Sequence, residues 1–83
     1  MEDITGNEVK MASMLIKDLL KTNDPLIEEM IAWYCKDYYL NEAMVRQGLQ
    51  SSPDKREGFY RNFMDNCKDP DLREKFSGRL DKY

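Results

Sequence analysis

Hydrophobic residues recur along this chain three to four positions apart, which is the period of an α-helix. Val9, Ala12 and Ile16 begin one such stripe, and it predicts a helix over residues 7–21. Further stripes of the same period lie within residues 27–38, 43–49, 59–67 and 72–80. No run alternates hydrophobic and polar residues as a strand does. The pattern therefore predicts an all-α fold, a small compact domain of four to five short helices.

Three prolines mark expected helix starts, because each follows a residue whose side chain can cap a helix. The pairs are Asp24-Pro25, Ser52-Pro53 and Asp69-Pro70. Proline at the first helical position loses no hydrogen bond, since the amide there has no partner within the helix. Two pairs have the spacing of a capping box and support a start, Thr5 with Glu8 and Ser51 with Asp54.

These starts divide the chain into segments with predicted boundaries. The expected helices span residues 7–21, 25–39, 41–48, 53–66 and 70–78. Asn41 is a suitable cap for the third helix and Gly48 a suitable end, while Gly78 is expected to fray the last helix. One long helix over residues 25–47 fits the same pattern, so the sequence leaves both arrangements open.

Composition describes a charge-rich globule rather than a disordered chain, with 41% hydrophobic and 35% charged residues in 83 positions. We expect one domain over residues 1–83, with a core small enough that self-association or a bound partner adds to its stability. No stretch approaches the roughly 18 apolar residues of a membrane span. The opening Met1-Glu2-Asp3 has no basic or apolar export signal, so we expect a cytoplasmic protein that does not insert into membranes.

The chain has few side chains suited to catalysis or metal binding. The chain has no histidine and only two cysteines, Cys35 and Cys67, which we expect to be free and largely buried thiols. Acidic pairs such as Glu28 with Glu29 are expected on solvated helix faces, whereas acid–base catalysis needs a carboxyl group that is desolvated or lies close to a like charge. The glycines are isolated, and the acids near Pro70 lack the order of a calcium loop. We therefore expect no catalytic residues, no cofactor and no metal.

Charge is distributed unevenly between the two parts of the chain. Residues 1–50 carry 9 acids and 5 bases, whereas residues 51–83 carry 7 acids and 8 bases. Acids interleave with the bases of the last third and the isoelectric point is about 4.9, so nucleic-acid binding is not expected. The acidic first part favours a basic partner instead.

The most informative side chains are the aromatic cluster Trp33, Tyr34, Tyr38 and Tyr39, with Met30 one turn earlier. The stripe through Met30, Tyr34 and Tyr38 is expected to pack inward. Trp33 and Tyr39 are rotated off it, and exposed Trp and Tyr are typical of interface hot spots. These five residues are therefore our candidate partner-binding site, although core packing with an amphipathic edge explains the same cluster.

The whole chain, including the segment VKMASMLIKDLL at residues 9–20, resembles small early proteins of T-even bacteriophages. Among these it resembles the cytoplasmic antiholins of lysis inhibition, the third rapid-lysis proteins. The resemblance rests on size, composition and general appearance, and no motif carries over a functional residue. It implies a non-enzymatic regulator that binds the cytoplasmic N-terminal segment of the holin and delays lysis of the host cell.

A second interpretation fits the same features. The chain could be a phage-type inhibitor or adaptor that binds a soluble host protein, such as RNA polymerase, a nuclease or a defence complex. Both interpretations need an exposed binding face and no active site. They differ in whether the target is part of a membrane protein, which the residues alone do not specify.

Overall fold

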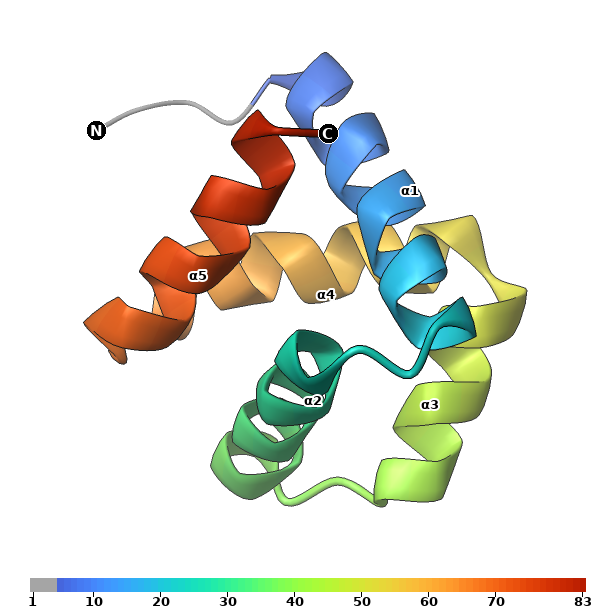
Figure 1. The fold of residues 1–83 in the computed structure, drawn as a ribbon. Coiled ribbons are helices and arrows are strands. Elements are labelled where there is room, and N and C mark those ends of the chain that lie inside the picture. The colour runs from blue at the N-terminus through green and yellow to red at the C-terminus, as the bar shows by residue number, and fades with distance from the viewer. Residues whose placement is uncertain (1–4) are drawn as a thin grey trace.

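The computed structural model describes residues 5–83, and this part of the chain consists of five helices without a strand. The all-α prediction is confirmed. In chain order the helices are α1 (Gly6–Lys21), α2 (Pro25–Tyr38), α3 (Glu42–Ser51), α4 (Pro53–Asn66) and α5 (Pro70–Asp81), as Figure 1 shows.

The proline-marked helix starts are confirmed. Asp24, Ser52 and Asp69 are the N-caps of α2, α4 and α5, and each side chain accepts a hydrogen bond from a backbone N–H of the first turn. Thr5 caps α1 in the same way, since its Oγ1 accepts from the Glu8 amide at 3.1 Å.

The second predicted capping box is wrong. Ser51 is the last residue of α3, and its hydroxyl donates to the Gln47 carbonyl instead of capping α4. Because Ser51 and Ser52 are adjacent, the sequence does not specify which of them caps α4. Ser52 takes it because Pro53, which favours the first helical position, follows directly.

A break at Tyr39 separates α2 from α3, so the single helix over residues 25–47 is wrong. Tyr39 has φ 55° and ψ 49°, the left-handed conformation that ends many helices. Asn41 then caps α3, as expected, by accepting from the Met44 amide.

Two predicted helix ends fall too early, because α3 continues past Gly48 and α5 past Gly78. A glycine inside a helix costs only about 1 kcal/mol relative to alanine. In α3 that cost is offset beyond the glycine by Leu49, the one buried residue of the helix.

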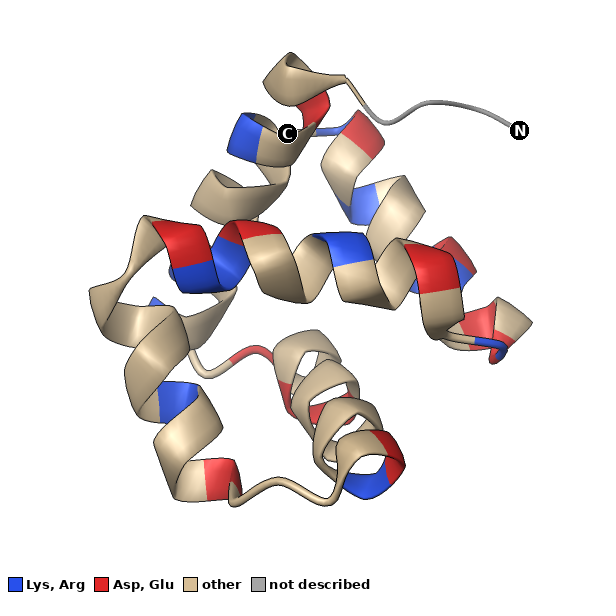
Figure 2. Ribbon diagram, turned by 180° about the vertical axis from the view of Figure 1, so that it is seen from behind, with Lys and Arg blue, Asp and Glu red and all other residues tan. Residues whose placement is uncertain are grey.

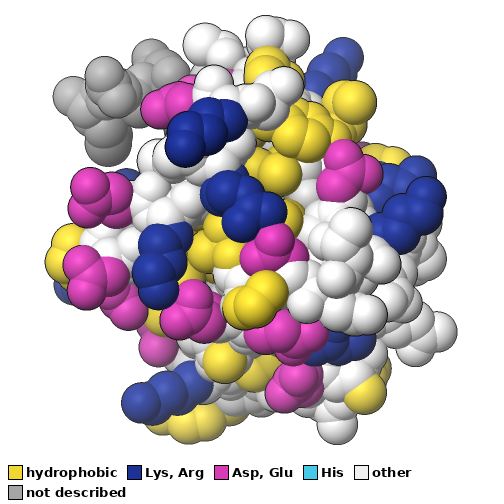
Figure 3. Space-filling view, in the orientation of Figure 1, with side chains coloured by type: hydrophobic (Ala, Val, Ile, Leu, Met, Phe, Trp, Pro, Cys, Tyr) yellow, Lys and Arg dark blue, Asp and Glu magenta, His cyan; other side chains and the backbone are white. Residues whose placement is uncertain are grey.

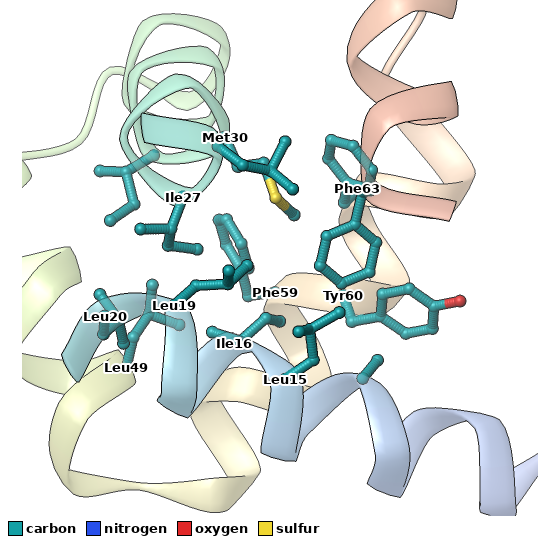
Figure 4. Packing of buried hydrophobic residues seen from close by; sticks show 14 of the residues in the cluster. Leu15, Ile16, Leu19, Leu20, Ile27, Met30, Leu49, Phe59, Tyr60 and Phe63 are labelled. Atoms are coloured by element: carbon teal, nitrogen blue, oxygen red, sulfur yellow. The ribbon is translucent and has the colours of Figure 1, made fainter. Parts of the chain in front are cut away.

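The core lies where α1, α2 and α4 meet. Figure 1 shows α4 running across the molecule between the α1–α5 pair and the α2–α3 pair. Figure 4 shows Ile16 and Leu19 of α1 facing Phe59 and Phe63 of α4, with Met30 of α2 above them. Each of these side chains is almost fully buried, and burying one of this size contributes about 1.5–3 kcal/mol.

Two hydrogen-bonded polar side chains tie α4 to the rest of the core. Arg56 is buried, and it donates from Nε to Ser13 Oγ of α1 at 3.0 Å and from a terminal nitrogen to the Leu49 carbonyl of α3 at 2.8 Å. Tyr60 donates its hydroxyl to the Glu8 carboxylate of α1 at 2.7 Å. Burial and this hydrogen bond raise the pKa of Tyr60, so it stays a neutral donor.

Contacts at both of its ends hold α5 in place. An Arg73 guanidinium nitrogen donates to the carbonyls of Phe63, Met64 and Cys67 and so caps the C-terminus of α4. At the other end of α5, Arg79 pairs with Asp24, the N-cap of α2. The last helix therefore connects the ends of two others.

Candidate functional site

The candidate residues of α2 lie at different depths. Met30 is fully buried, as its place on the inner stripe predicts, and so it belongs to the core. It does not reach the surface and is removed from the candidate partner-binding site. Tyr34 is half-buried, with its ring edge-on to Phe59 of α4 at a centroid distance of 4.9 Å.

The exposure of Trp33 and of Tyr38 is the reverse of what the sequence predicts. Trp33 is half-buried, because its ring packs edge-on against Phe63 of α4 at 5.6 Å, although its position predicted a place off the inner stripe. Tyr38, predicted to face inward, is exposed. It is in the last turn of α2, and its aromatic contacts are with Trp33 and Tyr34 of the same helix.

Several hydrophobic side chains in and beside the α2–α3 connection are exposed to solvent. Tyr39 is 94% exposed and Met44 is 73% exposed, whereas Tyr38 and Leu40 are about 40% exposed (38% and 42%). We call these four residues, Tyr38, Tyr39, Leu40 and Met44, the tip surface. Sequence reasoning found its two tyrosines but missed Leu40 and Met44, because Met44 has the spacing of a core-facing residue.

Beside the tip surface lies an open groove of about 340 Å³ where α2, α3 and α4 meet. Figure 2 shows how the ribbons of these three helices are arranged relative to one another. Its apolar lining includes Tyr34, Leu40, Met44, Val45, Leu49 and Phe59. Leu40 and Met44 belong to both features, so groove and tip surface form one uncovered apolar region.

Lys55 is the one charged residue in the lining of the groove within residues 5–83. Its aliphatic stem passes Gly48, where a Cβ atom would lie 3.7 Å from Lys55 Cγ. It forms no ion pair with a described residue. The groove therefore combines apolar walls with one solvent-exposed lysine.

Charged side chains near the groove form ion pairs with one another. Arg46 of α3 donates to Glu28 of α2 and to Glu42 of its own helix, and the hydrogen bond to Glu28 is the main reason that the Arg46 pKa is raised. Cys35 and Cys67 are both free thiols, as expected, and Cys67 is buried. Burial, with a smaller effect from Glu42, raises the pKa of Cys35, which disfavours its nucleophilic thiolate form at neutral pH.

The described residues contain no group of three or more metal-ligating side chains, and no helix among them is long and apolar enough to cross a bilayer. On the face shown in Figure 3, basic and acidic side chains are interspersed and neither sign forms a continuous patch. Comparison with known protein families, curated proteins and solved structures finds no match to this chain. The tip surface and groove are thus the features that carry a functional argument.

Proposed function

We propose that this protein is a non-enzymatic regulator that acts by binding a segment of another protein. The observation that carries the proposal is the apolar region formed by the tip surface and the groove. Its most exposed members are Tyr39, the C-cap that follows α2, and Met44 of α3, and both leave apolar area in water. Covering such area on association is favourable by about 25 cal/mol per Å² before the costs of binding.

The residue types of this region suit a protein ligand. Tyrosine supplies a large contact area with few rotatable bonds, and methionine adapts to an irregular partner surface. The half-buried rings of Trp33 and Tyr34 support Tyr38 from beneath, with centroid distances of 6.1 and 5.0 Å. Part of the binding surface is therefore held in position before a partner arrives.

The resemblance to cytoplasmic antiholins suggests the target. In this proposal the partner is the cytoplasmic N-terminal segment of a phage holin, and the complex forms in the host cytoplasm. Holding that segment in a stoichiometric complex delays formation of the membrane hole and so delays lysis. A short segment that orders on binding suits a small region such as this one.

The test is capture of the holin together with the timing of lysis. Tagged wild-type protein is expected to retain the holin from solubilised membranes, and infected cells lacking the chain are expected to lyse early with normal replication. Tyr39→Asp and Met44→Asp should each weaken capture. Met14→Asp is the matched control, because Met14 is exposed on α1.

Two outcomes would contradict the holin target. Retention of a soluble nuclease or polymerase without the holin would favour the host-protein interpretation. Unchanged lysis timing in cells that lack the chain would contradict a role in lysis inhibition.

A further inference from the structure

We infer that α3 is a hinged flap over the groove. It pivots about its C-terminal end at Ser52, and the ion pair between Arg46 and Glu28 is the clasp that holds its other end closed. The movement takes place within this chain and needs no partner, so it goes beyond the proposed function. It gives the groove two widths, one with α3 held against α2 and one with α3 swung away.

The C-terminal end of α3 is anchored by buried contacts. Leu49 is the one buried residue of this helix, and its carbonyl accepts from the buried Arg56 guanidinium at 2.8 Å. Ser52 alone separates α3 from α4, and its backbone is extended, with φ −132° and ψ 117°. A residue between two helices is where the backbone angles of a hinge change. The end of α3 at Ser52 therefore rotates but stays beside α4.

The N-terminal end of α3 is held more weakly. Figure 1 shows this end far from the junction with α4, where the α2–α3 connection leads into it. Residues 39–44 are exposed, and Val45 is only partly buried. Among residues 5–83, the contact between Arg46 and Glu28 is the one side-chain hydrogen bond that joins this half of α3 to another helix. The free end thus depends on a single ion pair.

The groove leaves space beneath this end of α3. Its volume is about 340 Å³, and its walls include Val45 of α3, Tyr34 of α2 and Phe59 of α4. The inner side of α3 is therefore not sealed against α2 and α4 along its length. Segments with few buried apolar contacts open locally at a lower cost than global unfolding. Outward movement of α3 is an opening of that kind.

The ion pair suits a clasp because both partners have an alternative when it breaks. The Glu28 and Arg46 side chains are 43% and 26% exposed, so water and salt reach them. Arg46 also contacts Glu42 of its own helix, and it keeps that partner when α3 swings away. Salt screens attraction between exposed charges. Raised ionic strength therefore shifts α3 towards the open position.

Cys35 is a natural reporter of this movement. It follows Glu28 by seven positions, which places both on the side of α2 that faces α3. It is half-buried, and burial followed by the negative charge of Glu42 raises its pKa, so the first turn of α3 lies close to the thiol. Opening of α3 exposes this thiol. Cys67 is the internal reference, because it is buried at the opposite end of α4 from α3.

The experiment measures how fast iodoacetamide alkylates Cys35 and Cys67 in the folded protein, by mass spectrometry of its peptides. Glu28→Gln weakens the clasp and should speed alkylation of Cys35 about two- to fivefold, with no change at Cys67. Glu29→Gln is the matched control, because the neighbouring carboxylate pairs with Lys75 of α5 and is similarly exposed. Added salt should speed alkylation of Cys35 in the wild type more than in Glu28→Gln.

Hydrogen exchange of the α3 amides is a second measurement that needs no cysteine. A helix of 10 residues released from its neighbours is marginal in water, so its amides lose protection when α3 opens. Exchange in α3 should therefore be faster in Glu28→Gln than in the wild type, while exchange in α1 and α4 is unchanged.

The flap requires faster alkylation of Cys35 and faster exchange in α3 together, and absence of either in Glu28→Gln would overturn it. Equal acceleration at Cys35 and Cys67 would show destabilisation of the whole fold and would overturn it as well. The same acceleration in Glu29→Gln would show that the ion pair to α3 is not the clasp.

Discussion

The α1–α4 contact and the α2–α3 end of the molecule are built from similar amphipathic helices, but they use their apolar faces differently. In the first region, Ile16, Phe59 and Phe63 are sealed against one another, and Arg56 satisfies polar groups of both neighbouring helices. At the second, α3 buries only Leu49 and leaves Met44 exposed.

This difference shows that an apolar stripe on a helix does not by itself identify core. The stripe of α1 meets α4 and becomes the centre of the fold, whereas that of α3 lies partly beyond its neighbours. Uncovered apolar area does not stabilise the isolated protein, and clustered area of this kind is typical of binding surfaces. The comparison therefore separates residues that hold the fold from residues available to a partner.

The largest expected effect comes from truncating the sealed region. Phe63→Ala removes a fully buried ring that contacts both Trp33 and Phe76, and it should lower the free energy of unfolding by about 3–5 kcal/mol. Met44→Ala at the tip surface should change it by less than about 0.5 kcal/mol. Urea denaturation followed by circular dichroism measures both. Equal losses would contradict the division into two regions.

A smaller decrease in the free energy of unfolding is expected when the polar link between the two regions is removed. Arg56→Met keeps much of the buried volume but leaves the Leu49 carbonyl and the Ser13 hydroxyl without their donor, at a cost of about 1–3 kcal/mol. Arg61→Met, at an exposed position of the same helix, should be nearly neutral. Hydrogen exchange of the α3 amides provides a second measurement, since Arg56 connects α3 to the core. Unchanged α3 protection in Arg56→Met would show that α3 does not depend on this link.

At the tip surface, one substitution should stabilise the fold while weakening binding. Tyr39 has a left-handed backbone that costs a non-glycine residue roughly 1 kcal/mol, so Tyr39→Gly should raise the free energy of unfolding by up to about that amount. Tyr38→Gly, one residue earlier and within the helix, should lower it instead. Thermal unfolding measures whether each substitution raises or lowers the stability of the fold. Destabilisation by Tyr39→Gly would show that the Tyr39 side chain helps to hold the fold.

The smallest expected effect depends on pH. The hydrogen bond from Arg79, followed by that from the Leu26 amide, lowers the pKa of Asp24 in the folded protein. Because the folded pKa is the lower one, this stabilisation is fully present at neutral pH and is lost as pH falls through about 4 and below. Asp24→Asn keeps a capping oxygen but loses the ion pair, which is partly exposed and should contribute only about 0.5 kcal/mol.

The check on this prediction is urea denaturation of wild type and Asp24→Asn at pH 7 and at pH 3. The difference between the two proteins should be present at pH 7 and shrink at pH 3. Asp69→Asn, at an N-cap with no ion pair among the described residues, is the control. A difference of the same size at both pH values would argue against a role for the Asp24 charge.

Features that depend on neighbouring residues in the chain could be predicted well. Asp24, Ser52 and Asp69 cap their helices because a short polar side chain reaches only the first amides that follow it. Placement of Trp33 and Tyr38 could not be predicted in the same way. The helical period gives only the direction in which each side chain leaves α2. Trp33 is half-buried because Phe63 of α4 packs against it, whereas Tyr38 is exposed because it lies at the end of α2.

By itself, the sequence determined an all-α fold of four to five helices, most of the helix starts, and the apolar stripe of each helix, because those properties arise from capping and from side-chain periodicity over a few residues. Only the tertiary structure decided which apolar sides are covered. Arg56 reaches Ser13 across 43 positions of the chain, and the groove exists only where three helices meet. Such contacts depend on how whole helices pack against one another, and no local pattern contains that information.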